Sequence, residues 1–326
     1  MKISLGIYPN VAPPEIIASA RLADDLGYST LWILDSHLLF HEVYTLLGAL
    51  AVSTKKVRLG TAVTNPLTRH PTVTAAAFAT LADLSGGRAS LGISIGDSAL
   101  KSMNLETAKM SVLAETVALC RSLMAGETVS FGQGKSARLH HLGPRVPIYV
   151  AATGPKMLAL AGRIADGVIL MNGVAPALID EAVGIVREGE RSVGRQRGSV
   201  DIAVWAACHP SPQAVKFNVA RAILRNIPGA TDDLTRKAAA RVKEAYDFAQ
   251  HGRAEADFAR LIPDEIVTRF AFSGSYQEIA AQIKALEPCD VDEVVLAIPV
   301  APGIAPRDVI MRGLGSVIGP AGLPAS

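Results

Sequence analysis

Residues 57–95 of this 326-residue chain read VRLGTAVTNPLTRHPTVTAAAFATLADLSGGRASLGISI. Short apolar runs at residues 57–64 and 89–95 have the length of buried strands. Between them, Pro71 opens a run of helical period that the Gly86–Gly87 pair ends. Parallel strands need a crossover connection of this kind. The stretch therefore predicts one strand–helix–strand unit of a parallel sheet.

The same alternation continues in both directions along the chain. Further strands are predicted at residues 2–7, 30–34, 146–151, 166–171, 200–207 and 291–298. Helices are predicted at residues 13–26, 43–53, 107–125, 156–162, 175–193 and 306–318, with a polar hairpin at 126–141. Most strands are continuous apolar runs, as in sheets covered on both faces. Eight such units favour an α/β fold, a closed (β/α)8 TIM barrel, over a doubly wound open sheet.

Residues 208–290 contain more sequence than one crossover needs. Within them, residues 216–250 are predicted to form long, charged helices, with the charges of residues 236–244 on a solvated face. We interpret the region as a helical insertion between strands seven and eight, which covers the barrel or forms a subunit contact. The whole chain, 1–326, is then expected to be a single barrel domain.

Composition excludes several classes of protein. Lysine and arginine total 32 and aspartate and glutamate 30, so the net charge of +2 argues against a nucleic-acid partner. No apolar run reaches the roughly 18 residues of a membrane span. Three widely spaced cysteines fit free thiols in a reducing compartment, and we expect a cytoplasmic protein. With 5% aromatic residues, we also expect little aromatic stacking around a bound ring.

Polar residues follow the predicted strands where each strand ends, which is where the active site of a TIM barrel lies. Asp35, Ser36 and His37 follow the second strand, and Gly96 and Asp97 follow the fourth. Asp35 has two interpretations of similar weight, as a catalytic group or as a helix cap.

A second polar segment, Thr153–Gly154–Pro155, opens a helix. It is either an ordinary helix start or one whose exposed N–H groups bind a phosphate. The spacings of zinc, Walker and Rossmann motifs do not occur in the sequence. We therefore predict neither a metal site nor a Rossmann-type nicotinamide site.

Three segments carry a resemblance: TNPLTRHPTVTA at residues 64–75, LSGGRASLGISIGDSA at 84–99, and VAATGPKMLALAGRIADGVIL at 150–170. Together they resemble the bacterial luciferase-like superfamily. The pattern is similar to the coenzyme F-420-dependent branch around methylenetetrahydromethanopterin reductase. The resemblance extends over residues 1–207 and the last strand, whereas residues 208–290 contribute little to it.

The resemblance implies a flavin or deazaflavin ring lying across the strand ends. Asp35 and Ser36 would face the ring or the substrate, and Gly96 and Asp97 would lie near the reacting centre. Other roles implied by position are a cis peptide at Ala62-Val63, hydrogen bonds to the ring edge from Thr64 and Asn65, and phosphate binding through backbone N–H groups of Ala151, Ala152, Thr153, Gly154 and Pro155.

The reaction implied is hydride transfer between coenzyme F-420 and a small electrophilic substrate with a C=N, C=C or nitroaromatic group. Three residues remain alternatives for proton transfer: His37, or Asp35 or Asp97 if burial raises the pKa of an aspartate above about 4. Two alternatives to this enzyme are an FMN-dependent monooxygenase of the same fold and a non-catalytic flavin-binding barrel. We also expect a homodimer.

Two residues depart from the pattern of the sugar-phosphate dehydrogenases in this superfamily. Ser36 stands where those enzymes place histidine, and Asp97 where they place glutamate. We also find no cluster of basic residues in the sequence that would bind a substrate phosphate. These differences favour a reductase.

Overall fold

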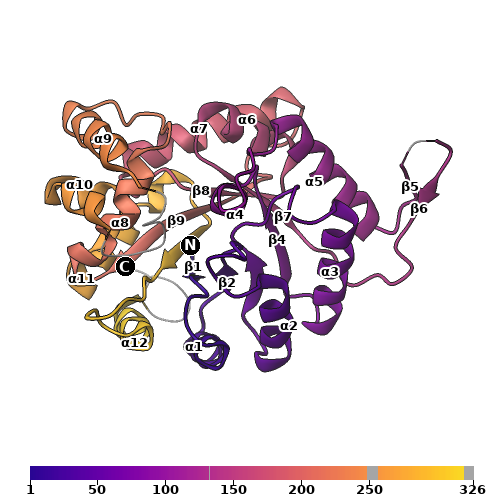
Figure 1. Ribbon diagram of the computed structural model, residues 1–326, viewed down its shortest axis with the longest axis horizontal. Helices are drawn as coiled ribbons and strands as arrows, with labels where there is room; N and C mark the ends of the chain where they lie inside the picture. Colours follow the sequence, from indigo (N-terminus) through magenta and orange to yellow (C-terminus); the bar gives the residue numbers. More distant parts are fainter. Residues whose placement is uncertain (132, 248–255, 319–326) are drawn as a thin grey trace.

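Parallel strands form a closed barrel in the computed structural model, which describes residues 1–131, 133–247 and 256–318 (Figure 1). Eight strands close the barrel within these residues: β1 (Lys2–Ile7), β2 (Thr30–Ile33), β3 (Arg58–Thr61), β4 (Ala89–Ile93), β7 (Ile148–Ala152), β8 (Gly167–Leu170), β9 (Asp201–His209) and β11 (Glu293–Ala297). Pairing of β8 with β9 closes the ring. The predicted (β/α)8 barrel is confirmed, and the open-sheet alternative is wrong.

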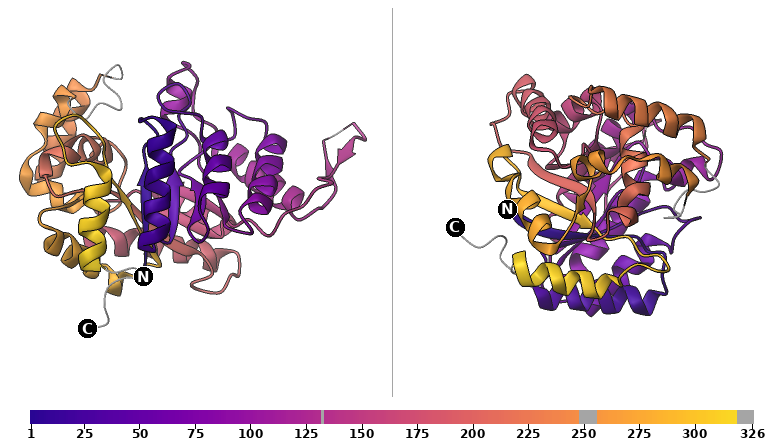
Figure 2. Two further views of the ribbon diagram at one scale, coloured as in Figure 1. Left: turned by 90° about the horizontal axis from the view of Figure 1, so that it is seen from below. Right: turned by 90° about the vertical axis from the view of Figure 1, so that its left-hand side faces the viewer.

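Helices surround the barrel: α1 (Pro13–Leu26), α2 (Val43–Ser53), α3 (Pro71–Leu84), α5 (Met110–Met124), α6 (Pro155–Ile164), α7 (Pro176–Ser192), α11 (Tyr276–Lys284) and α12 (Arg307–Ile318). Proline opens α1, α3, α6 and α7, where its missing N–H costs no hydrogen bond. Gly27, at φ +78°, ends α1 in the left-handed conformation that glycine adopts without strain. Helix α12 lies beside α1 and completes the outer layer (Figure 2).

Short elements complete this part of the chain. Strands β5 (Val129–Ser130) and β6 (Ser136–Ala137) form the predicted hairpin, which projects from the barrel (Figure 1). A one-turn helix, α4 (Ser98–Lys101), follows β4, and a 3-10 turn, η3 (Glu287–Cys289), precedes β11. None of the helices in the described ranges is both long and apolar enough to cross a membrane.

Between β9 and β11 the chain forms α8 (Pro212–Ile223), α9 (Asp233–Ala245), the 3-10 helix η2 (Asp257–Leu261), α10 (Asp264–Phe270) and the short strand β10 (Phe272–Ser273). The predicted helices of residues 216–250 are present as α8 and α9, but residues 224–232 between them are not helical. Pro228 and Gly229, at φ +76°, interrupt the helix, and Asp232 caps the new start at α9. The end of that prediction, at Gln250, and the last residues of the predicted 1–326 domain lie outside the described residues.

Large aromatic side chains fill the inside of the barrel. Trp32, Tyr149 and Trp205 form one buried cluster, and the rings of Trp32 and Tyr149 meet edge to face at 5.1 Å. Glycines make the space for them, since a Cβ on Gly60 would lie 2.5 Å from the Trp32 ring. Both tryptophans are therefore buried in the barrel, and Trp205 also borders the cavity at its rim.

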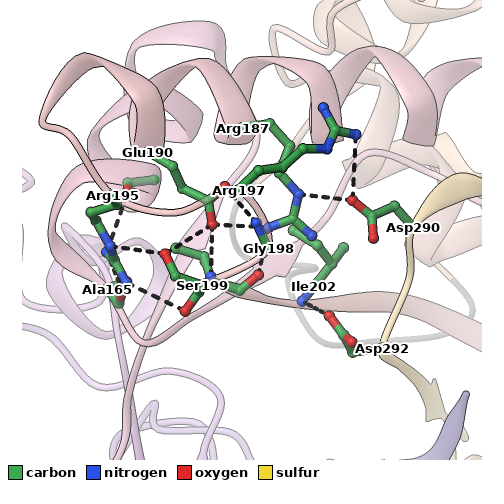
Figure 3. A network of polar contacts seen from close by, with 12 residues as sticks. Ala165, Arg187, Glu190, Arg195, Arg197, Gly198, Ser199, Ile202, Asp290 and Asp292 are labelled. Carbon is green, nitrogen blue, oxygen red and sulfur yellow. Dashed lines mark hydrogen bonds and ion pairs between the residues drawn. The ribbon is translucent and has the colours of Figure 1, made fainter.

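An ion-pair network ties α7 to the start of β9 (Figure 3). The Glu190 carboxylate is fully buried and accepts hydrogen bonds from Arg187 Nη1 at 3.0 Å and from the backbone N–H of Val200 at 2.7 Å. Arg187 also pairs with Asp290, before β11, at 2.9 Å. The network thus connects α7 to the segments that precede two neighbouring barrel strands.

We predict that Glu190→Ala lowers the free energy of unfolding by about 3–5 kcal/mol, because Arg187 and the backbone N–H groups of Gly198 and Val200 lose a buried acceptor, although Arg187 keeps Asp290. Urea unfolding of the wild-type and variant proteins measures the difference. The control is Glu188→Ala on the same helix, which removes an exposed partner of Arg191 and should cost less than about 1 kcal/mol. Equal losses in the two variants would contradict the prediction.

Candidate active site

A cavity of about 790 Å³ lies at the carboxyl ends of the barrel strands. Segments that follow β2, β3, β4, β7 and β8 line it, and α8 and α9 contribute further lining residues. Most predicted site residues line this cavity: Asp35, Ser36, Ala62, Val63, Asn65, Gly96, Asp97, Ala151, Ala152, Thr153 and Gly154. Residues far apart in the sequence are thereby brought to one rim.

The segment after β3 forms part of the cavity wall. The β3 ladder ends at Thr61, earlier than predicted, and the Ala62-Val63 peptide bond is cis, as the resemblance implies. Thr64 then forms an isolated bridge with Ile93. The predicted contact of Thr64 with a ring edge is not supported, because its hydroxyl accepts from Tyr44 at 3.2 Å and the residue is fully buried outside the lining.

Asp35 is held at the end of β2 by an arginine from the next unit. Its side chain is 1% exposed, and Oδ2 accepts from Arg69 Nη1 at 2.9 Å. The Arg69 guanidinium lies 4.0 Å over the Tyr44 ring and also pairs with Glu42. No described residue donates a hydrogen bond to Asp35 Oδ1. One carboxylate oxygen is therefore fixed, and the other is left without a protein partner in a residue that lines the cavity.

The neighbours of Asp35 differ in what they can do. Ser36 lines the cavity and donates a hydrogen bond to Ser98 at 3.0 Å. His37 is half-buried in the turn that follows Ser36 and does not line the cavity. The structure therefore does not support His37 as a proton donor to a group bound there.

Asp97 carries two cations on its carboxylate. Lys101 Nζ lies 2.7 Å from Oδ1, and Arg221 Nη2, from α8, lies 2.5 Å from Oδ2. Burial alone would raise the pKa of Asp97, but the charges of Arg221, Lys101 and Arg225 outweigh it and lower the pKa to about 2. Asp97 is thus ionised at neutral pH, which argues against the expectation that it donates a proton.

The start of α6 leaves backbone donors without a side-chain cap. Gly154 occupies the cap position, and a Cβ built on it would meet nothing closer than the Asn226 carbonyl at 3.6 Å. The Thr153 carbonyl is held by Asn172 Nδ2 at 3.0 Å. The prediction that Pro155 donates to a phosphate is wrong, because proline has no N–H. Any backbone N–H donors to a phosphate at the start of α6 must therefore come from the residues next to Pro155.

Gly96 is required by the backbone. Its φ is +92°, and a Cβ there would lie 2.5 Å from the Leu100 side chain.

The Asn65 side chain is held by its own loop, since its Oδ1 accepts hydrogen bonds from the N–H groups of Leu67 and Thr68 at 3.0 Å each. The Asn65 amide nitrogen therefore remains for other contacts in the cavity.

The sequence analysis missed a set of basic and polar lining residues: Tyr8, Lys101, Asn218, Arg221, Arg225 and Lys243. The expectation of no basic cluster is therefore wrong. A signal existed, because Asn218, Arg221 and Arg225 are spaced by three and four residues, which places them on one helix face.

The cavity is richer in aromatic side chains than the 5% aromatic content of the chain suggests, while the expectation of little stacking around a bound ring stays a prediction. Six aromatic side chains line the cavity: Tyr8, Phe40, Trp205, Phe217, Tyr246 and Phe270. They come from segments spread along the chain, so a low total content did not predict where they gather.

We predict that Asp97→Asn destabilises the protein only where the wild-type carboxyl is ionised, because Arg221 and Lys101 lose the negative charge that they share. The folded-state pKa lies below the unfolded one, so this contribution is present above about pH 4 and is lost as the pH falls toward 2. Urea unfolding at about pH 7, 5 and 3 should give equal gaps at the first two values and a smaller one at the third. A gap independent of pH would contradict this.

The comparisons with known proteins agree with this geometry. The family model for luciferase-like monooxygenases matches residues 2–293. The chain is 31% identical to 5,10-methylenetetrahydromethanopterin reductase of Methanolobus tindarius, over 93% of this chain and 95% of that protein. It is 36% identical, over 58% of this chain and 61% of the relative, to an F-420-dependent glucose-6-phosphate dehydrogenase of Nakamurella multipartita.

A solved structure extends the likeness to the whole fold. The coenzyme F-420-dependent tetrahydromethanopterin reductase of Methanopyrus kandleri superposes with a TM-score of 0.77, at 25% identity, covering 97% of this chain and 98% of that one. Together with the match to the family model, this shows that the chain belongs to the bacterial luciferase-like family.

Proposed function

We propose that this protein is a coenzyme F-420-dependent oxidoreductase acting on a small electrophilic substrate with a C=N, C=C or nitroaromatic group. When bound, the deazaflavin supplies a two-electron hydride carrier, and the protein supplies position and electrostatics. The relatives support the proposal. The dehydrogenase of Nakamurella multipartita and the solved reductase of Methanopyrus kandleri are named as F-420-dependent, and the Methanolobus tindarius relative is named as a methylenetetrahydromethanopterin reductase.

The observation that carries the proposal is the match between the cavity and a flat ring with an anionic side chain. Small residues from several strand ends line part of the cavity: Ala62, Val63, Ala151, Ala152, Ala206 and Ala207. They leave room for a planar group against the strand ends. The uncapped start of α6 borders the same cavity and offers N–H donors for a phosphate.

Asp35 is the residue that we propose for contact with the reacting groups. Arg69 fixes its orientation, and Oδ1 is a buried acceptor that no described residue satisfies. A buried acceptor of this kind costs free energy unless a bound group donates to it. Asp35 would accept a hydrogen bond or a proton from the substrate or the ring edge. Ser36 would position the neighbouring segment through Ser98.

Asp97 has a different proposed role. Its carboxylate holds Lys101 and Arg221 at the cavity rim and stays ionised. We propose that it orients these cations and the segment around Gly96, and that it moves no proton. The homodimer and the cytoplasmic location that the sequence analysis expects stay predictions.

We predict that the purified protein binds coenzyme F-420 and that Gly154→Val weakens this binding by roughly tenfold or more. The open space around Gly154 means that valine should be accommodated in the fold, while its side chain obstructs the backbone donors. Quenching of cofactor fluorescence measures the affinity, and thermal unfolding checks the fold. If Gly154→Val binds coenzyme F-420 with unaltered affinity, the cofactor phosphate does not bind at the start of α6.

Titration with FMN tests the alternative, a luciferase-like monooxygenase. Both cofactors carry a phosphate that the start of α6 could bind. A difference in affinity between them would therefore come from contacts with the ring. Tight binding of FMN without binding of coenzyme F-420 would overturn the proposed function.

We predict that Asp35→Asn lowers turnover by about 10²–10⁴-fold while leaving cofactor affinity nearly unchanged. Turnover is measured as reoxidation of reduced coenzyme F-420 by a panel of iminium, enone and nitroaromatic acceptors. The control is Glu42→Gln, which alters the other carboxylate on Arg69 and does not line the cavity. Wild-type turnover in Asp35→Asn would exclude a role for Asp35 in the reaction.

A further inference from the structure

A cluster of cations borders the cavity where α8 and α9 cover the barrel. Four basic side chains line the cavity, Lys101, Arg221, Arg225 and Lys243, against two carboxylates, Asp35 and Asp97. Asp35 is neutralised by Arg69, which is not a lining residue. This leaves Asp97 as the lining carboxylate that faces the four cations.

The Asp97 carboxylate is already paired with two of these cations. Lys101 and Arg221 both contact its oxygens, at 2.7 Å and 2.5 Å. Within residues 1–131, 133–247 and 256–318, no ion pair is formed by Arg225 or Lys243. The cavity therefore carries a surplus of positive charge on the side of α8 and α9.

Arg225 is one of the two lining cations without an ion-pair partner among the described residues. It lies just beyond the end of α8, one turn from Arg221, and close enough to Tyr8, Tyr246 and Asp97 for their charges to act on it. The residue is half-buried, and loss of solvation, followed by the charge of Arg221, lowers the pKa of Arg225 to about 10, so it remains a cation at neutral pH. A partly buried cation without an ion-pair partner is unfavourable, and a bound anion would offset both the loss of solvation and the repulsion.

The position of Arg225 ties it to the start of α6. The next residue, Asn226, lines the cavity, and its carbonyl lies 3.6 Å from the place of a Cβ on Gly154. Backbone N–H donors and a guanidinium thus border the same part of the cavity. Such a combination suits a carboxylate or a phosphate, because arginine binds these groups through two parallel hydrogen bonds.

We propose that Arg225, supported by Arg221 and Lys243, forms a binding site for an anionic group, a carboxylate or a phosphate, of a ligand in the cavity. The anion comes from the substrate or from the acidic side chain of the cofactor. Naming the substrate or the cofactor as the source of the anion rests on the proposed function. The existence of an anion site at Arg225 does not.

The test is calorimetric titration with inorganic phosphate of the wild-type protein, Arg225→Gln and Arg241→Gln. Arg241 provides the matched control, because it lies exposed on α9 and does not line the cavity. We expect the wild type and Arg241→Gln to bind phosphate alike and Arg225→Gln to bind it roughly tenfold more weakly or not at all. Arg225→Lys should retain part of the affinity, since it keeps the charge and loses the planar fork.

A second arm repeats the titration with the wild-type protein saturated with coenzyme F-420. If phosphate no longer binds, the cofactor's own acidic side chain fills the site; if it still binds, the site takes an anionic substrate. Absence of phosphate binding in the wild type, or equal binding by a folded Arg225→Gln, overturns the proposal. Failure of coenzyme F-420 to bind would instead overturn the proposed function and leave the first arm valid.

Discussion

The closed ring of parallel strands is the constraint on which the rest of the structure depends. All eight strands pair in parallel around the ring, because a helical crossover returns the chain to the same end before each new strand, so their carboxyl ends meet at one rim. Asp35, Asp97 and Gly154 are distant in the sequence and line one cavity for this reason. The aromatic cluster around Trp32 and Tyr149 fills the barrel below that rim, and the cavity of about 790 Å³ lies above it. The site is thus a consequence of strand direction and of what fills the interior.

Charge is distributed unevenly around the cavity, although the net charge of the chain is only +2. On one side, Arg69 balances Asp35 and leaves a single free carboxylate oxygen. On the other, Asp97 is outnumbered by the cations of α4, α8 and α9. We therefore propose different roles for the two carboxylates of the rim: Asp35 would face the reacting groups, and Asp97 would hold the surrounding cations in place. The helices between β9 and β11 supply part of the binding surface as well as covering the barrel.

Local signals in the sequence predicted much of the fold. The bounds of α2 and α3 agree with the prediction, because apolar periodicity and Pro71, the first residue of α3, act within the segment itself. The strand positions were predicted within a few residues, and the order of the barrel followed from counting the units. The helices of residues 216–250 were predicted without the position of the break between α8 and α9, although Pro228–Gly229 marks it.

The site was less predictable, because it depends on contacts between distant segments. The sequence around Thr64 does not show that its hydroxyl accepts a hydrogen bond from Tyr44. Likewise, the sequence around His37 does not show that this residue stays outside the cavity lining. The cations on α8 have helical spacing in the sequence, yet only the fold shows that their face covers the barrel rim and meets Asp97. The aromatic lining was missed for the same reason, as six rings from separate segments converge on one cavity.

The central claim is that one cavity at this rim holds a deazaflavin, with its ring against the strand ends and its phosphate at the start of α6. A crystal structure of the protein with bound coenzyme F-420 tests it most directly. The account predicts the ring beside Ala62 and Val63, and the phosphate within hydrogen-bond distance of the N–H groups around Gly154. A cofactor bound outside the cavity, or a phosphate with no contact to the first turn of α6, would contradict it.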